Sequence, residues 1–408
     1  MLVTLIPLFD ETLTVKAYSL FSQKKNMLLN PSLLGTGQRD GAGTIAGLEV
    51  IESMGIDTIS SDKDVFVSIN NISIFTDINE QCKDAPHGQI VLLMDRSIKP
   101  EEMYVNRIRE LKADGYKLAI RKLNVADFEP YRSVLSLVDY VLLDHKKIDI
   151  SKAKIYFSKV YPNVKLCAVN VETTNIFEEL KKEGGYTLYE GEFYRVPVTK
   201  GETEVAPLKV NYIELLNVVN DVDFDLTKAA DVIGRDTALV IELLRMVNRM
   251  AVNSEITSIR HAAAMLGQRE LKKWINTAVT NQLCADKPNE VTRVSLLRAK
   301  FAENLAASFD LAGQASELFL MGLFSVLDII LDMKMEDALK KVKVSKQIEK
   351  ALIDRTGEFA EVLSFMIAYE SASWGEIDRI MLLKEMDADV VYAAYCGALT
   401  WYRDLFTA

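Results

Sequence analysis

The 408-residue chain has few of the side chains that bind transition metals, with 3 histidines and 4 cysteines. The cysteines, Cys82, Cys167, Cys284 and Cys396, lie far apart, and no two of them form a Cys-x-x-Cys pair. This spacing excludes a compact zinc motif and a disulfide framework. A reducing compartment, the cytoplasm, is therefore expected.

Long hydrophobic runs and an excess of positive charge are also missing. The most apolar stretch, residues 318–331, is broken by Ser325 and Asp328 and indicates a buried helix rather than a membrane span. The start, "MLVTLIPLFD", lacks the basic region and the cleavage site of a signal peptide. With 48 Lys and Arg against 58 Asp and Glu, the net charge is −10. Neither nucleic acid nor a membrane is expected as a partner.

The sequence does contain the pattern of two folded domains. Its 49% hydrophobic and 26% charged residues are typical of a globular protein, and its length suits two cores. In the first half, short β-rich runs alternate with helix-like stretches, which predicts parallel strands buried on both faces. These runs span residues 65–69, 90–94, 117–120, 139–143 and 165–169. The first two runs of the chain are joined by "DET", too short for a parallel crossover, so they should form a hairpin.

After about residue 205 the strand signal vanishes. Residues 237–250 place Leu239, Leu243 and Val247 on one helical face, which predicts an all-α second half. Residues 198–209, with a Gly, a Pro and mixed charges, are the linker candidate. The predicted fold class is α/β plus all-α, with domains at residues 1–200 and 201–408.

Four stretches resemble, in order and spacing, the EAL family of cyclic-di-GMP phosphodiesterases. They are "FVSINN", "GYKLAIRKLN", "VDYVLLDHKKI" and "AVNVETTNIFEELKKEGGYTLYEGEFY". The resemblance implies a TIM-like (β/α) barrel, incomplete or irregular here, with carboxylates and an Asn at its strand ends. In that family these residues hold two divalent cations that activate a water molecule.

Carried over residue by residue, the resemblance places other side chains at most of the functional positions. The substituted positions are Ser19, Gln23, Leu92, Arg121, Lys122 and Leu142. The positions that survive are Asn70, Asp144, Glu172 and Gly191. At about 5 Å and an effective dielectric near 20, one unit charge against a divalent ion is worth roughly 6 to 7 kcal/mol. Cations in place of the family's Asp-Asp pair therefore predict a barrel without metals, cofactors or catalysis.

Alternative interpretations stay open at several of these residues. Asn70 can cap a helix instead of binding a metal, and Glu172 can be a first-turn helix carboxylate. Arg121 and Lys122 can form ion pairs at the rim or grip a nucleotide phosphate without metal. Residues 35–44, "GTGQRDGAGT", lack the Lys-Ser/Thr of a phosphate loop and indicate a loop in the barrel wall.

Residues 220–275 resemble the HDOD domain, an all-α relative of the HD phosphohydrolases, with a signature at Asn248, His261, Gly267 and Trp274. Residues 368–401 resemble the end of bacterial proteins that join a degenerate EAL barrel to an HDOD domain. The His-Asp pair of an HD site would fall near Ser325 and Val326, and no histidine follows His261. His261 is expected at a helix start and Asp225 as a helix N-cap. Met246, Met250 and Trp274 are interpreted as core residues, with a protein-binding surface as the alternative.

These observations predict a pseudo-enzyme of bacterial signal transduction that acts through protein–protein interaction. The expected partners are other signalling proteins or a second copy of the chain, and cyclic di-GMP is not expected as a ligand. The alternatives are a metal-independent cyclic-di-GMP receptor and, last, a cyclic-di-GMP phosphodiesterase.

Overall fold

The computed structural model describes residues 1–23, 44–195, 207–221, 223–250 and 256–406. They fall into two compact units. The first unit gathers Met1–Val196, Ala307–Asp310 and Ser364–Ala408, and the second gathers Pro197–Ala306 and Leu311–Leu363. Most of the predicted linker, and all of the predicted loop at residues 35–44 except Thr44, lie outside the described residues.

Eight strands close into a barrel in the first unit. They are β1 (Leu2–Phe9), β2 (Val15–Gln23), β3 (Asp64–Ser68), β4 (Ile90–Met94), β5 (Lys117–Arg121), β6 (Tyr140–Asp144), β7 (Lys165–Val169) and β8 (Leu188–Glu190). The strands from β2 to β8 pair in parallel, whereas β1 runs antiparallel to both of its neighbours, β2 and β8. The carboxyl ends of β2 to β8 therefore meet at one end of the barrel, where loops of this fold class carry function.

The predicted hairpin at the start of the chain is confirmed. Strand β1 pairs antiparallel with β2, with Leu2 opposite Gln23 and Phe9 opposite Val15. Between them, the Asp10 carboxylate accepts hydrogen bonds from the backbone N–H of Thr12 at 2.8 Å and of Thr14 at 3.0 Å. An Asp side chain that binds its own backbone in this way favours a tight turn.

One buried cluster fills the inside of the barrel. It consists of strand residues only: Leu8, Ala17, Phe66, Val91, Leu93, Ala119, Tyr140, Leu142, Cys167 and Leu188. Because side chains alternate across a strand, residues two positions further along each strand face the same interior. The predicted barrel, and with it the fold class, is confirmed.

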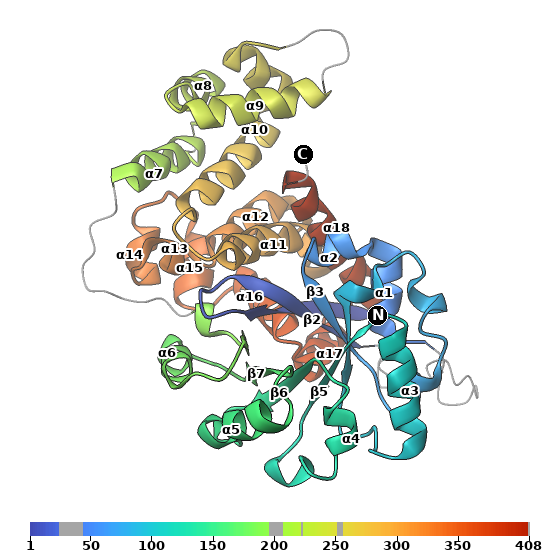
Figure 1. Ribbon diagram of the computed structural model, residues 1–408. Helices are drawn as coiled ribbons and strands as arrows, with labels where there is room; N and C mark the ends of the chain where they lie inside the picture. Colours follow the sequence, from blue (N-terminus) through green and yellow to red (C-terminus); the bar gives the residue numbers. More distant parts are fainter. Residues whose placement is uncertain (24–43, 196–206, 222, 251–255, 407–408) are drawn as a thin grey trace. The chain divides into compact units, whose positions relative to one another are not determined.

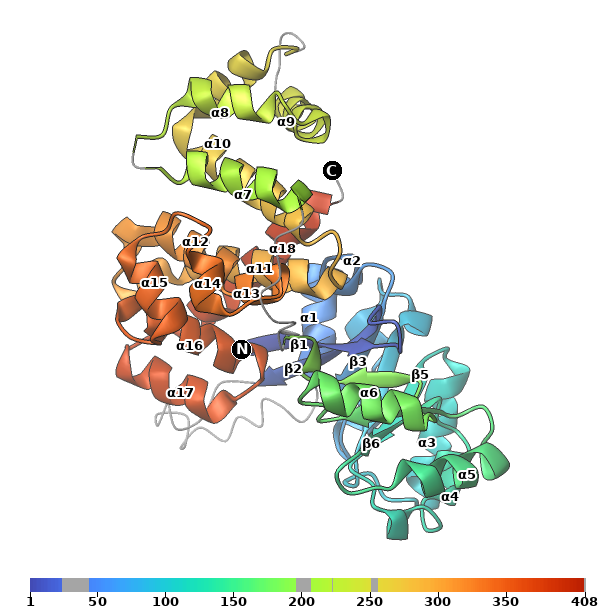
Figure 2. The ribbon, with the colours of Figure 1, turned by 90° about the vertical axis from the view of Figure 1, so that its left-hand side faces the viewer.

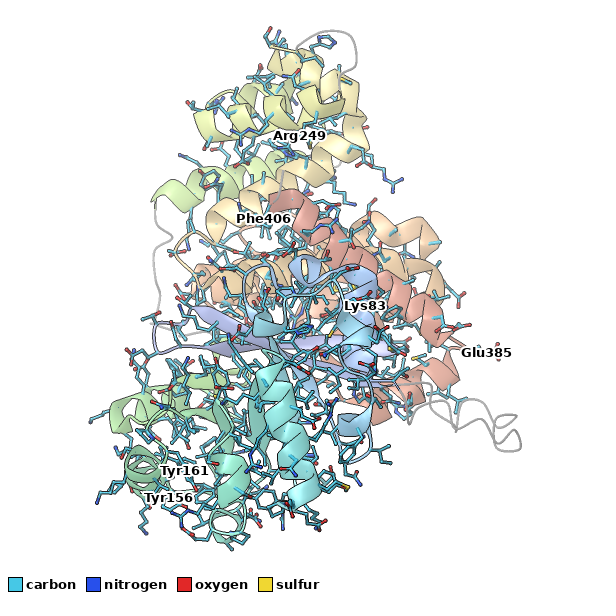
Figure 3. All side chains as sticks on the ribbon, turned by 45° about the vertical axis from the view of Figure 1, so that its right-hand side comes forward. Lys83, Tyr156, Tyr161, Arg249, Glu385 and Phe406 are labelled. Atoms are coloured by element: carbon cyan, nitrogen blue, oxygen red, sulfur yellow. The ribbon has the colours of Figure 1, made fainter. Side chains whose placement is uncertain are left out.

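Helices cover the outside of the barrel (Figure 1). They are α1 (Ala46–Met54), α2 (Ile56–Ser60), α3 (Glu102–Ala113), α4 (Arg132–Leu135), α5 (Ile150–Val160) and α6 (Thr174–Glu183). Helix α3 buries Val105, Ile108 and Leu111, an i, i+3, i+6 stripe that fits a helix lying on a sheet. At the end of α5, Tyr156 and Tyr161 lie together with ring centroids 5.9 Å apart (Figure 3).

The last helices of the chain pack on the barrel. They are the end of α16 (Glu358–Glu370), α17 (Trp374–Leu383) and α18 (Ala388–Phe406), and they lie beside β1 and β2 (Figure 2). The Val3 N–H donates to the Tyr369 hydroxyl at 3.2 Å, and Gln23 Nε2 donates to Asp378 Oδ2 at 2.9 Å. The predicted second domain, residues 201–408, therefore differs from the second compact unit at its carboxyl end.

The second unit is all-α, as predicted. Its helices are α7 (Pro207–Val219), α8 (Leu226–Ile233), α9 (Thr237–Met250), α10 (Ile259–Leu283), α11 (Asn289–Leu305), α12 (Ala315–Phe324), α13 (Leu327–Leu331), α14 (Met335–Leu339) and α15 (Lys346–Ile353). Asp225 caps α8 by accepting from the Thr227 N–H at 2.7 Å, which confirms that prediction. Leu239, Leu243 and Val247 are buried on α9, as the helical period required.

The apolar stretch 318–331 belongs to two helices rather than to one. Helix α12 ends at Phe324 and α13 begins at Leu327. In the described part of the chain, no helix is both long enough and apolar enough to cross a membrane.

The hydrogen bond from Val3 to Tyr369 gives a stability prediction. Tyr369→Phe leaves the buried Val3 N–H without an acceptor and should lower the free energy of unfolding by about 1–3 kcal/mol. Tyr186→Phe is the matched control, because the buried Tyr186 hydroxyl has no hydrogen-bond partner among the described residues. Urea unfolding of both variants checks this, and equal losses would contradict it.

Candidate functional site

The barrel mouth is the set of inward-facing side chains at the carboxyl ends of the strands. Ser19 and Phe21 lie two and four positions beyond Ala17 on β2, and Glu190 lies two beyond Leu188 on β8. Ser19 Oγ donates to Glu190 Oε2 at 2.8 Å. Burial raises the pKa of Glu190 above its usual value, while the Ser19 hydrogen bond and the Arg121 charge act against this rise. The mouth thus holds a partly buried carboxylate.

Arg121 is the cation of the mouth. It is the last residue of β5, and its guanidinium lies over the Phe21 ring at 5.3 Å from the centroid. Arg121 Nη2 donates to Ser68 Oγ at 3.3 Å, whereas the buried Arg121 Nε has no hydrogen-bond partner among the described atoms. Cation–π contact and nearby opposite charge stabilise a guanidinium in such a place.

Lys122 points to a different neighbour. Its Nζ lies 3.6 Å from Asp95 Oδ2, and its backbone adopts φ 62°, a left-handed conformation that side-chain-bearing residues seldom take. Burial acts to raise the pKa of Asp95, but hydrogen bonds from Ser97 and the charges of Lys122 and Arg121 hold it below its usual value. Of the alternatives for this Arg-Lys pair, the structure places Lys122 in a rim ion pair.

Asn70 and Glu172, two surviving positions, make local contacts. Asn70 Oδ1 accepts from the backbone N–H of Ile72 and of Ser73, both at 2.9 Å, so it caps a short turn. Glu172 pairs with Lys146 at 2.6 Å, and its side chain is 63% exposed. Neither contact involves the side chains of the mouth.

The other two surviving positions lie at the ends of β6 and β8. Asp144 ends β6 and pairs with Lys147 at 3.1 Å. Gly191 follows β8, and a Cβ atom there would lie 2.0 Å from the Val171 carbonyl oxygen. The close approach of the two chain segments therefore requires glycine at this position.

Three substituted positions lie away from the polar cluster of the mouth. Gln23 donates to Asp378 on α17, as described above. Leu142 is part of the inner cluster. Leu92 is fully buried, but it is absent from that cluster, which contains its neighbours Val91 and Leu93. Leu92 thus faces the outer side of the barrel wall, and a carboxylate there would not face the mouth.

A cavity of about 320 Å³ lies beside the mouth. Its lining includes Asn170, Glu172, Glu190, Glu192, Arg195 and Glu370. The guanidinium of Arg195 is already paired, with Glu370 at 3.0 Å and with Glu192 at 3.6 Å. Carboxylates therefore outnumber cations in this cavity, which disfavours an anionic ligand there.

The donor set of the mouth was compared with the two-cation site that the EAL resemblance implies. Throughout the described ranges, no group of three or more His, Cys, Asp or Glu side chains is arranged to hold a metal ion. A guanidinium lies among the mouth residues, and hard divalent ions prefer several oxygen ligands. The described residues do not fit such a pair of ions.

A group of exposed apolar side chains follows three successive strands at the same end of the barrel. This rim patch consists of Ile72, Phe75, Met103 and Val125, which are 57%, 43%, 58% and 62% exposed. The rings of Phe75 and Tyr104 pack together with their centroids 5.3 Å apart, which joins the segment after β3 to the start of α3.

Hydrogen bonds and an ion pair hold the segments of the rim patch together. Arg107 on α3 donates to the carbonyl oxygens of Ile74 and Thr76, at 2.9 and 3.1 Å. Arg96 Nη2, after β4, lies 3.4 Å from Asp127 Oδ1, after β5. These contacts fix the segments that carry the exposed apolar side chains, and a contiguous exposed apolar patch marks an interaction surface.

In the second unit, two of the HDOD-signature residues have structural roles, Asn248 through hydrogen bonds and Gly267 through its backbone conformation. Asn248 makes two hydrogen bonds with the backbone of Ile256, at 2.6 and 2.9 Å. Gly267 interrupts α10 with φ 75°, a conformation that favours glycine. His261 is exposed in the first turn of α10, and Trp274 is half-buried on the same helix.

The positions expected for a His-Asp pair are buried between α11, α12 and α13. Ser325 Oγ donates to the Gly322 carbonyl at 2.7 Å and lies 3.1 Å from Arg298 Nη1, which donates to it. Val326 precedes α13 and is 3% exposed.

Sequence reasoning missed several residues of this end of the barrel. The bond from Ser19 to Glu190 joins residues 171 positions apart, and Phe21 was not considered as a partner of Arg121. The rim patch was also missed. Its signal is visible in retrospect, because Ile72, Phe75 and Val125 are apolar residues in the segments after β3 and β5, and Met103 is an apolar residue in the first turn of α3.

Comparison with known proteins gives a family model for the second half and two relatives that extend over both halves. Residues 205–368 match the model of the HDOD domain. The chain is 27% identical over 326 residues to the Cyclic di-GMP phosphodiesterase CdgJ of Vibrio cholerae, covering 78% of this chain and 74% of that protein. It is 24% identical over 411 residues to the protein YuxH of Bacillus subtilis, covering 98% of each.

Among solved structures, the EAL enzyme Bd1971, in its form bound to cAMP and cyclic di-GMP, is 13% identical with a TM-score of 0.36. The match covers 47% of this chain and 60% of that one.

The similarity to CdgJ contradicts the prediction that the chain is not an enzyme, because that relative is named as a phosphodiesterase. The prediction depended on matching single residues of this chain to ligand positions of the EAL family. The structure shows where this matching was inaccurate. Leu92 does not face the barrel interior, so its side chain says little about a ligand there. Two carboxylates near the strand ends, Glu190 and Asp95, were left out of the count of ligands.

The buried carboxylate of the mouth gives a pH prediction. The raised pKa of Glu190 means that the folded protein binds this proton more tightly than the unfolded chain does. Stability from this group is therefore complete below the usual value of 4.5 and falls as the pH rises from there through the raised pKa. Glu190→Gln, whose amide oxygen can still accept from Ser19, removes this loss.

Unfolding free energies measured across the acid-to-neutral range check this. The free energy of unfolding of Glu190→Gln should increase relative to that of the wild type as the pH rises above 4.5. Glu172→Gln, at an exposed carboxylate, is the matched control. A Glu190→Gln curve that runs parallel to the wild type would refute the account.

Proposed function

Because the chain joins an EAL-like barrel to an HDOD domain, we propose that it is a regulatory protein of cyclic-di-GMP-linked signalling that acts by binding other proteins. The rim patch is the observation that carries this proposal. Its apolar side chains lie in water on segments that the protein holds in place, so their burial against a partner is favourable at little cost in loop ordering. The partner is another signalling protein, and a second copy of the chain is the alternative.

The composition of the rim patch also suits protein recognition. Aromatic residues, Met and Arg are enriched at protein interfaces, and the patch offers Phe75 and Met103 with Arg96 and Arg107 beside them. Arg107 already donates to two backbone carbonyls, so it supports the surface rather than reaching outward.

A paired substitution tests the rim patch. Phe75→Glu with Met103→Glu places two charges in the patch and should weaken partner capture from native lysate at least about ten-fold. Leu382→Glu with Leu383→Glu is the matched control, because these leucines are 64% and 70% exposed on α17 of the same unit. The measurement is quantitative mass spectrometry of the captured proteins, with light scattering of the purified chain to detect a dimer.

The control variant should retain the proteins that the wild type captures, and the rim variant should lose them. Loss of a dimer in the rim variant would identify the second copy as the partner. If both variants capture what the wild type captures, the rim patch is not the binding surface.

The second candidate function is action on cyclic di-GMP itself, as binding or as hydrolysis. The similarity to CdgJ favours it, and so does the guanidinium of Arg121 at the strand ends, since a phosphodiester is an anion. The carboxylates of the neighbouring cavity act against it.

Titration calorimetry with cyclic di-GMP, followed by chromatography of the products, measures this candidate directly. If it holds, Arg121→Met should weaken binding about ten-fold or more, because a charge-assisted hydrogen bond is worth about 1.5–3 kcal/mol. Lys99→Met removes an exposed cation after β4 and should leave binding unchanged. If the wild type shows no heat of binding and forms no product, this candidate is excluded.

A further inference from the structure

In the second compact unit, Lys272 lies at the junction of two cavities. A cavity of about 670 Å³ and a smaller one of about 140 Å³ share Lys272, Glu317 and Leu320 in their linings. Lys272 lies on α10 and is only partly exposed. Among the described residues, its Nζ has no hydrogen bond and no carboxylate at ion-pair distance, and it lies 6.0 Å from the centroid of the Phe224 ring.

The charged neighbours of Lys272 are occupied elsewhere. On α12, Glu317 Oε2 accepts from Ser345 Oγ at 2.6 Å. At the end of α7, Asp221 pairs with Lys343. The next residue on α10, Lys273, pairs with Glu303 at 2.6 Å. Arg269, one turn earlier, and Glu349, on α15, also line these cavities.

These surroundings shift the equilibrium of Lys272 toward the free amine. Burial lowers the pKa of Lys272, and the charges of Glu317 and Asp221 oppose this without restoring the usual value. A lysine that is partly desolvated and not held in an ion pair carries more free amine, the nucleophilic form, than an exposed lysine does.

We propose that Lys272 is a modification site that is acylated by small acyl phosphates entering the larger cavity. The cavity has room for such a molecule, and Lys340 and Lys343 also line it. The amine nitrogen of Lys272 attacks the carbonyl carbon, and a C–N bond forms. The C–O bond to the phosphate breaks, and the phosphate leaves with the electron pair and takes one amine proton. The product is an amide and inorganic phosphate.

Acylation removes the positive charge of Lys272 and leaves Glu317 and Asp221 facing a neutral amide. It would thereby make the signalling state of the helical unit sensitive to the supply of acyl phosphates. This inference does not depend on the rim patch, which lies in the other unit.

The test uses the full-length protein and acetyl phosphate at limiting amounts, with the occupancy of each lysine followed by mass spectrometry. At about pH 8, Lys272 should be acetylated at least about five-fold faster than Lys340, which is exposed, paired with Asp337 and has a raised pKa. Lys273 is the control for confinement, because it borders the smaller cavity but is held by Glu303. It should react more slowly than Lys272.

The pH dependence separates reactivity from simple access. The advantage of Lys272 over Lys340 should shrink as the pH rises above about 10, where exposed lysines also become neutral. A Lys272 rate at or below that of Lys340 or Lys273 would overturn the proposal, as would a ratio that does not change with pH. Because these readouts are rates on the wild-type protein, no variant has to fold.

Discussion

The direction of the strands is the constraint on which the candidate site depends. Strands β2 to β8 run parallel, so their carboxyl ends, and the segments that follow them, meet at one end of the barrel. This brings Ser19, Arg121 and Glu190 together across the whole first half of the chain. It also gathers the rim patch from three separate segments. The antiparallel strand β1 closes the barrel between β2 and β8 without disturbing this arrangement.

The same end of the barrel combines two kinds of surface. Inside, Arg121 lies over Phe21, and its charge acts on a partly desolvated Glu190. The polar side chains of the mouth therefore interact mainly with one another. Outside, the rim patch leaves apolar area in water. Burying that area against a partner is favourable, since a buried apolar side chain contributes about 1.5–3 kcal/mol. The proposal of a protein-binding regulator follows from this exposed apolar area.

Part of the fold could be predicted from the sequence, because the residues that determine it are close together in the chain. The runs at 90–94 and 165–169 coincide with β4 and β7, because continuous apolar runs between helices have few other interpretations. The cap at Asp225 was predictable from its position before a helical period. The packing of α17 and α18 on the barrel was not, since Gln23 and Asp378 meet across 355 positions and nothing local signals it. The side of the strand that Leu92 faces also needed the structure, because a shift of one residue reverses it.

The central claim is that the rim patch at the carboxyl end of the barrel binds a partner protein in the cell. Photo-crosslinking in living cells, with a photoreactive amino acid at Met103, tests it most directly. The control carries the same group at Ile155, which is 54% exposed on α5. The account predicts a discrete crosslinked protein band from position 103 that is absent from position 155. Equal or absent crosslinking at the two positions would contradict it.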